Sequence, residues 1–159
     1  MPDPAQETVD YVAITRLQQA YGDAVNRRAW DEFADLFLPD ATIHIDTVTN
    51  PPVDATGPAE LGAFIGGAVE RFEFFEFVVL NSHVELGGDE PDRARARVFM
   101  CELRQERLNG HWSNAFGVYH DDYARVDGRW WFARRRYQSL ARSGRGEVFP
   151  FPSEAARST

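Results

Sequence analysis

The dipeptide Asp127-Gly128 constrains the fold more than any other feature of the sequence. Both residue types adopt positive φ readily, so the pair suits a two-residue type I′ turn between antiparallel strands. Counting outward from the turn predicts three cross-strand pairs: Asp121 with Arg134, His120 with Arg135, and Tyr123 with Phe132. One face of this hairpin then combines polar groups with large aromatics, as a small-molecule pocket requires. That face carries Gly117, Tyr119, Asp121, Tyr123, Trp130, Phe132, Arg134 and Arg136.

The rest of the chain predicts an α+β order, with helices first and strands afterwards. Apolar periodicity indicates helices over residues 8–27, 30–37 and 58–72, with a strand over 41–47 and a loop over 50–58. Four strands follow, over residues 74–86, 94–107, 111–126 and 129–141, and Asn109-Gly110 is a second hairpin signal. We therefore expect a cone-shaped, curved antiparallel sheet wrapped around three N-terminal helices. Residues 1–142 form this cone, and residues 143–159 form an arm laid over the pocket or over a neighbouring subunit.

Composition excludes several classes of partner. The chain has 159 residues and a net charge of −8, which suits one domain and argues against binding to nucleic acid or an anionic membrane. Residues 1–10 lack the apolar core of a signal peptide, and no segment resembles a membrane span, so we expect a cytoplasmic protein. The single cysteine, Cys101, cannot form an internal disulfide, and its strand-like context favours a buried thiol.

The sequence contains no cofactor or metal motif. His44 and Asp46 share a strand face, but neither a second histidine at helical spacing nor a cysteine cluster accompanies them. No glycine-rich phosphate loop and no nucleophile elbow occur. We expect neither a cofactor nor a metal, so any chemistry would depend on side chains.

Two segments carry a family resemblance. The first contains Tyr21, Asp23 and Trp30 and continues through residues 36–41; the second is the predicted hairpin with Asp127-Gly128. Together they resemble the opening and closing parts of SnoaL-like proteins in the nuclear transport factor 2-like superfamily, over about residues 9–137. The resemblance implies a cone-shaped α+β barrel, a homodimer or homotrimer, and an active site inside the cone.

In the dehydratase branch of this family, an aspartate near the end of the first helix orients a histidine on the third strand, and the histidine acts as general base. The matching positions here are Asn26, four residues before Trp30, and Phe77, counted back from Asn81. Both members of the dyad are replaced. The chain therefore needs other groups if it catalyses a related reaction.

Candidate replacements lie on the strands. The even-numbered residues of 94–100 are apolar and alternate with arginines, so Glu102 and Arg104 extend an interior face. They form either a base with its electrophilic partner or a compensated ion pair. His83 is a reserve base, because it has the same strand parity as Phe77. Tyr119 matches a pocket-lining position in the family, whereas Tyr21 either lines the cavity or packs beneath it.

These observations leave three functional hypotheses. The first is a cofactor-free lyase, isomerase or cyclase acting on a small hydrophobic, cyclic molecule of polyketide or steroid type. Glu102 would be the acid or base, and Arg104, Tyr119 and Asn26 would donate hydrogen bonds to a developing oxyanion. The second is a non-catalytic ligand-binding or assembly domain that has lost the dyad. The third is a structural partner, like the β-subunit of ring-hydroxylating oxygenases.

Overall fold

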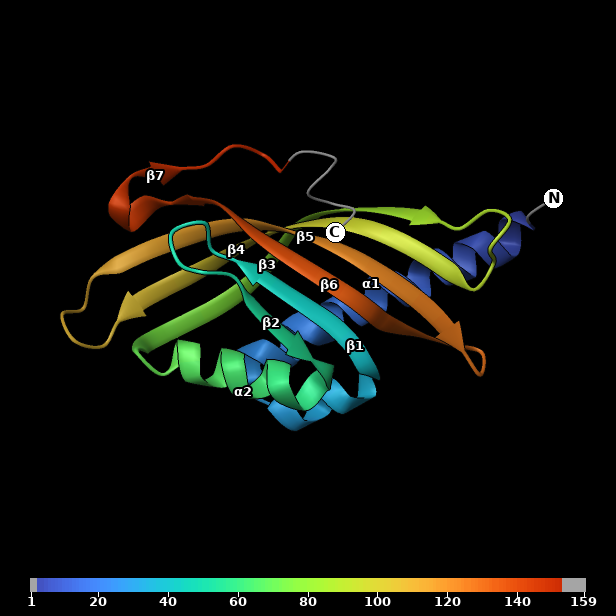
Figure 1. Ribbon diagram of the computed structural model, residues 1–159, viewed down its shortest axis with the longest axis horizontal. Coiled ribbons are helices and arrows are strands. Elements are labelled where there is room, and N and C mark those ends of the chain that lie inside the picture. Colours follow the sequence, from blue (N-terminus) through green and yellow to red (C-terminus); the bar gives the residue numbers. More distant parts are fainter. Residues whose placement is uncertain (1–2, 153–159) are drawn as a thin grey trace.

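The computed structural model describes residues 3–152, and it contains two α-helices, two short 3-10 helices and seven strands (Figure 1). The helical elements are α1 (Pro4–Arg27), η1 (Trp30–Asp35), α2 (Gly57–Val69) and η2 (Ser143–Arg145). The strands are β1 (Phe37–Asp46), β2 (Val53–Thr56), β3 (Phe72–Leu86), β4 (Arg93–Glu106), β5 (Trp112–Val126), β6 (Arg129–Arg142) and β7 (Glu147–Val148). The α+β class is confirmed.

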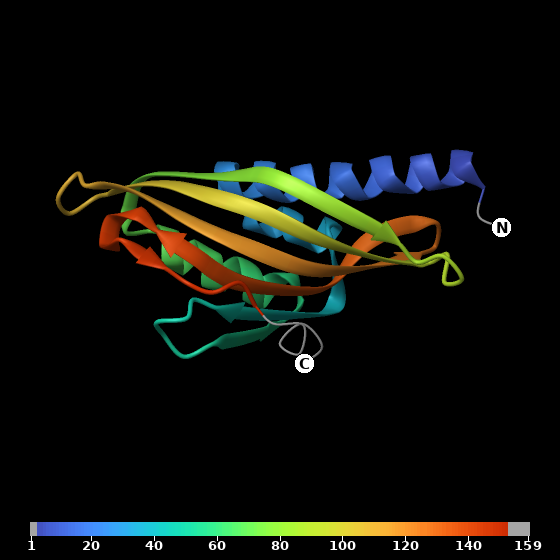
Figure 2. The same cartoon turned by 90° about the horizontal axis from the view of Figure 1, so that it is seen from above.

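All seven strands form one curved sheet in the order β2-β1-β6-β5-β4-β3, with β7 added to β6. The sheet is mixed rather than antiparallel throughout, because β1 runs parallel to β6. It arches over the helices, with α1 along the β3 side and α2 beneath β1 (Figures 1 and 2). The concave face of the sheet and the helices therefore enclose the interior, as the cone prediction requires.

Helix α1 is held in place by a stripe of buried side chains. The stripe comprises Ile14, Leu17, Tyr21, Ala24 and Val25, which recur at the three- and four-residue spacing of one helix face. Asp3 caps the first turn by accepting a hydrogen bond from the backbone nitrogen of Ala5 at 3.0 Å. The helix begins four residues earlier than its apolar pattern indicated, because this cap lies in the polar N-terminal segment.

The Asp127-Gly128 turn has the predicted conformation, with φ of 51° and 77°. The register beyond it differs from the prediction, because β6 has a β-bulge between the pairs Tyr123–Phe132 and Asp122–Arg134. Tyr123 does face Phe132, but the expected partners of Asp121 and His120 are wrong by one residue. The observed pairs are Asp121 with Arg135, His120 with Arg136, and Asp122 with Arg134. Arg135, rather than Arg134, consequently points inward.

A second bulge, in β3 between Val79 and Asn81, turns the side chain of His83 to the outer face of the sheet. Phe77 faces the interior, but after the bulge the inward positions are Ser82 and Val84. The side chain of His83 is 57% exposed and lies 3.4 Å from Glu85. The prediction that His83 points to the same side as Phe77 is therefore wrong.

Three segments outside the helices and main strands also differ from expectation. The predicted loop over 50–58 contains β2, which pairs with β1. The Asn109-Gly110 turn does join β4 to β5, but through a wider loop in which only Gly110 has positive φ. In the described part of the C-terminal arm, Phe149 donates to the carbonyl oxygen of Leu140, and Phe151 stacks on Phe99. Phe99 projects from the convex face, so residues 149–151 lie on the outside of the sheet, whereas Gly144 and Arg145 at the start of the arm line the pocket.

Candidate active site

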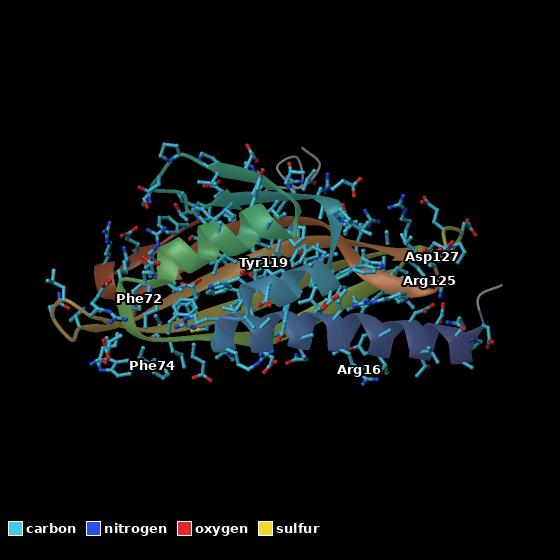
Figure 3. All side chains as sticks on the ribbon, turned by 90° about the horizontal axis from the view of Figure 1, so that it is seen from below. Arg16, Phe72, Phe74, Tyr119, Arg125 and Asp127 are labelled. Atoms are coloured by element: carbon cyan, nitrogen blue, oxygen red, sulfur yellow. The ribbon has the colours of Figure 1, made fainter. Side chains whose placement is uncertain are left out.

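A cavity of about 740 Å³ lies between the concave face of the sheet and the two α-helices. Its apolar wall includes Leu61, Phe64 and Ile65 of α2 together with Phe72, Phe75 and Phe77 of β3. Its polar wall comes from β4, β5 and β6 and includes Glu102, Arg104, Ser113, Tyr119, Arg135, Tyr137, Ser139 and Arg142. In Figure 3, Tyr119 lies in the middle of the molecule, whereas Arg16 points away from it. A cavity that combines an apolar wall with convergent polar groups is suited to binding a small molecule.

The deep end of the cavity contains a buried ion pair. Nε and Nη2 of Arg135 donate to the two carboxylate oxygens of Asp121, both at 2.8 Å, and the side chains are 2% and 0% exposed. The guanidinium carbon lies 3.9 Å from the ring centre of Tyr119 and 4.2 Å from that of Tyr21. Burial alone lowers the pKa of Arg135, but the Asp121 carboxylate outweighs burial and raises it. Arg135 is therefore a fixed cation between two aromatic rings.

A chain of hydrogen bonds also fixes the position of Asp121. The hydroxyl of Tyr123 donates to Oδ2 of Asp121 at 3.0 Å, and the amide of Gln18 donates to the Tyr123 hydroxyl at 3.0 Å. Ser82 in turn donates to Oε1 of Gln18 at 2.7 Å. This network connects α1, β3 and β5, so the orientation of Arg135 is set by three separate elements.

The structure places both predicted tyrosines, Tyr21 and Tyr119, in the cavity wall. Tyr21 is at the centre of an aromatic cluster, with its ring 5.3 Å from Phe33 and 6.2 Å from Tyr119. Burial raises the pKa of both phenols. They are therefore protonated near neutral pH and can donate a hydrogen bond to an oxygen in the cavity.

Glu102 and Arg104 project from β4 into the cavity wall. Nη1 of Arg104 lies 3.5 Å from Oε2 of Glu102, and Nη2 donates to Oγ of Ser113 at 3.3 Å. Burial raises the pKa of Glu102, although Arg104 and Arg142 oppose the increase. A carboxyl group in such an environment binds a proton more readily than an exposed glutamate does.

Tyr137 of β6 completes this group, and sequence reasoning did not identify it. Its ring lies directly over Gly117, where a Cβ atom would come within 2.2 Å of Cε2 of Tyr137. Its hydroxyl lies 3.2 Å from Oγ of Ser139, and burial, followed by the charge of Glu102, raises its pKa to about 12. We call Glu102, Arg104, Ser113, Tyr137 and Ser139 the polar belt. Tyr137 points inward only because of the β6 bulge, which the sequence pattern does not reveal. Gly117, which leaves the space that the ring occupies, is the local signal for this contact.

Phe77 and Asn26, the positions that the resemblance matches to the dyad, both have structural roles. Phe77 is buried, lines the cavity, and places its ring 5.4 Å from Tyr21. Asn26 is exposed and lies outside the cavity wall, so its predicted contact with a substrate is wrong. Its amide is instead used by the backbone of β3, where it donates to the carbonyl oxygen of Phe77 at 3.0 Å and accepts from the nitrogen at 2.7 Å.

The remaining histidines do not converge on one site. His44 pairs with Asp54 on β2 rather than with Asp46, with Nδ1 and Oδ1 at 2.6 Å. His111 lines the mouth of the cavity. Between residues 3 and 152, no group of three or more histidine, cysteine, aspartate or glutamate residues has an arrangement suited to a metal ion. Over the same residues, no helix has the length and apolar character needed to cross a membrane.

Comparison with known proteins identifies the family of this chain. No curated protein matches the sequence. Among solved structures, hexachlorocyclohexane dehydrochlorinase LinA-type3 from Novosphingobium barchaimii is 18% identical, with a TM-score of 0.78 over 94% of this chain and 100% of that one. A nuclear transport factor 2-like protein with a cystatin-like fold from Novosphingobium aromaticivorans is 20% identical, with a TM-score of 0.72 over 99% and 97% of the two chains. At these identities the likeness concerns the fold. The sequence model of the SnoaL-like domain matches residues 6–136, and the chain therefore belongs to the SnoaL-like family.

Proposed function

We propose that this protein is a cofactor-independent lyase or isomerase that moves a proton on a small, hydrophobic, cyclic molecule bound in the cavity. The observation that carries the proposal is the position of Glu102, a mostly buried carboxyl group with a raised pKa in the wall of a cavity that has an apolar and a polar side. Such a group is a stronger base than an exposed glutamate, and its protonated form persists to higher pH than that of an exposed glutamate.

The surrounding donors suit the charge that proton removal creates. When a base takes a proton from a carbon beside a carbonyl group, negative charge develops on the carbonyl oxygen. Tyr119 and Tyr137 are protonated phenols in the same wall, and Arg104 is a neighbouring cation. Preorganised donors of this kind stabilise an oxyanion more than water does. A structural neighbour named as a dehydrochlorinase of hexachlorocyclohexane supports elimination from a ring as one form of this chemistry.

A second function, ligand binding without catalysis, is favoured by a different observation. Asn26 forms two hydrogen bonds with the backbone of β3, and the family resemblance matches Phe77 to the position of a histidine base. In this alternative, Glu102 and Arg104 form a compensated pair in the wall of a binding cavity. A role as a structural subunit of a larger enzyme is the weaker alternative, and purification as a homo-oligomer that binds an apolar ligand would count against it.

Proton transfer can be tested without knowing the natural substrate. The cyclic ketone β-tetralone has acidic protons beside its carbonyl group, and their exchange in deuterium oxide can be followed by NMR. We expect the protein to accelerate exchange above the buffer rate and Glu102→Gln to abolish the acceleration. The control is Glu85→Gln, which removes an exposed carboxylate from β3. Acceleration that persists in Glu102→Gln would reject Glu102 as the base, and no acceleration by the wild-type protein would favour the binding function.

A further inference from the structure

The cavity is richer in positive charge than the chain as a whole. The complete sequence has 25 acidic and 17 basic residues. The residues that line the cavity reverse this balance, with five arginines (Arg71, Arg104, Arg135, Arg142 and Arg145) and two glutamates (Glu102 and Glu106). A cavity lined by an excess of positive groups, in a protein of net negative charge, points to a ligand of negative charge.

Most of these arginines have an acidic partner close by. The partners are Asp121 for Arg135 at 2.8 Å, Glu106 for Arg71 at 3.3 Å, and Glu147 for Arg142 at 3.2 Å and for Arg145 at 3.8 Å. Glu147 therefore serves two arginines with one charge. The acid nearest to Arg104 is Glu102.

Glu102 neutralises the charge of Arg104 only in part. Its Oε2 atom is 3.5 Å from Nη1 of Arg104, longer than a charge-assisted hydrogen bond. Arg145 lies still farther from its acid, at 3.8 Å, but its side chain is 72% exposed, so water solvates its charge. The Arg104 side chain is 12% exposed, and its Nε atom is buried with no hydrogen-bond partner among residues 3–152. When Glu102 binds a proton, Arg104 is left as a mostly buried cation without an anion, which is an unfavourable state. An anion supplied by a ligand would remove that cost.

We propose that the cavity binds a ring compound that carries a carboxylate, held by Arg104 within the polar belt. The inference rests on the proposed function, because it names the class of molecule that the same cavity would process. The hydrophobic ring would contact Phe72, whose own ring lies 5.3 Å from the Arg104 guanidinium, and the apolar α2 wall. The carboxylate would accept hydrogen bonds from Arg104, and such charge-assisted bonds are stronger than those to a neutral oxygen.

Binding of this anion is coupled to proton uptake. A second negative charge beside Glu102 raises the pKa of that carboxyl further, so the complex binds more protons than the two separate partners at intermediate pH. The charged and titratable groups that interact with Glu102 are Arg104 and Cys101 of β4, Arg142 and Tyr137 of β6, Tyr119 of β5, and Arg71 between α2 and β3. An arginine guanidinium is always charged in a protein, and burial raises the pKa of the two tyrosines and of the Cys101 thiol, so Glu102 is the group that takes up the proton. Uptake occurs only at pH values near the pKa of Glu102; above that pKa the carboxyl stays ionised in the complex and remains the base.

Two probes of the same shape test the inference: naphthoate, which carries a carboxylate, and naphthamide, its neutral amide. Calorimetric titration at neutral pH is expected to give a preference for naphthoate of about tenfold or more, as a hydrogen bond to a charged group implies. Arg104→Met should remove the preference. Arg95→Met, which removes an equal charge from the exposed outer face of the same strand, should retain it. Titrations in buffers of different ionisation enthalpy should show proton uptake that Glu102→Gln abolishes.

The outcomes separate this inference from the proposed function. If naphthoate binds no more tightly than naphthamide, or if Arg104→Met keeps the preference, the inference is overturned while a binding cavity for neutral rings remains. If neither probe binds, the inference is also overturned, and β-tetralone exchange tests the proposed function independently. A preference that both arginine variants lose would mean that overall charge, rather than Arg104, selects the anion, and this would equally reject the inference.

Discussion

The side chain of Asn26 forms two hydrogen bonds with the backbone of Phe77, as a neighbouring strand would. Phe77 lies on β3, the last strand on its side of the sheet, so its outward backbone groups have no strand partner there. The amide of Asn26 supplies both the donor and the acceptor that this edge needs. Helix α1 is thereby joined to β3 at the two positions that the family resemblance matches to a catalytic dyad in dehydratases.

This relationship predicts a stability effect without a catalytic one. Asn26→Ala leaves the Phe77 backbone groups without their partner, and we expect a loss of about 1–3 kcal/mol in the free energy of unfolding. Urea denaturation measures this loss. Because Asn26 lies outside the cavity wall, the rate of β-tetralone exchange by the folded variant should be unchanged. Asn50→Ala, in an exposed loop, is the control for stability. A large loss of exchange activity in a stable Asn26→Ala protein would contradict this reading.

Much of the fold is predictable from local sequence, but the site is less so. The Asp127-Gly128 turn and the α1 stripe are local signals, and both have the expected form. The inward orientation of Arg135 is not local, because it depends on one extra residue in β6. A bulge reverses the facing of every residue beyond it, and its position follows from the packing of the whole sheet. The same physical effect, in β3, moved His83 to the outside.

The contact between Gly117 and Tyr137 predicts a strong steric coupling. A Cβ atom at residue 117 would lie 2.2 Å from Cε2 of Tyr137, so Gly117→Ala must displace the ring. We expect a destabilisation of about 1–3 kcal/mol, as is typical of overpacked cores, together with slower β-tetralone exchange. In a Tyr137→Ala background, the added methyl group should cost much less, and a double-mutant cycle by urea denaturation measures the difference.

Gly67 provides the matched control for this cycle. It lies in α2, and a Cβ atom there would meet no atom within 4 Å. Gly67→Ala should therefore be neutral or stabilising, since alanine favours a helix by up to about 1 kcal/mol over glycine. Equal costs of Gly117→Ala with and without the Tyr137 ring would show that the glycine has another role.

The Asp121–Arg135 pair predicts an asymmetry between single and double variants. Removing one partner leaves the other as an isolated charge in a site that is at most 2% exposed, which typically costs about 3–5 kcal/mol. We expect losses of this size for Asp121→Leu and Arg135→Met in urea denaturation. The double variant should be more stable than the sum of the two losses implies, because no unpaired charge remains. Strictly additive losses would mean that the two side chains contribute to stability independently.

The raised pKa of Glu102 predicts how both stability and activity depend on pH. A carboxyl whose pKa is higher in the folded state than in the unfolded state, where it is about 4.3, contributes stability below the unfolded value and loses it as pH rises through the folded value. Glu102→Gln cannot ionise, so the variant should gain stability relative to the wild-type protein as pH rises through this range. Urea denaturation at several pH values measures the gain.

The rate of β-tetralone exchange should follow the same ionisation, because the carboxylate is the base. Its midpoint should lie above the pKa of an exposed glutamate, and Arg104→Met should raise the midpoint further, since Arg104 stabilises the carboxylate. Arg95→Met, on the outer face, should leave the midpoint where it is in the wild-type protein. A midpoint that moves downward in Arg104→Met would reject this electrostatic coupling between Glu102 and Arg104. A rate that is independent of pH across the acidic range would exclude Glu102 as the proton acceptor.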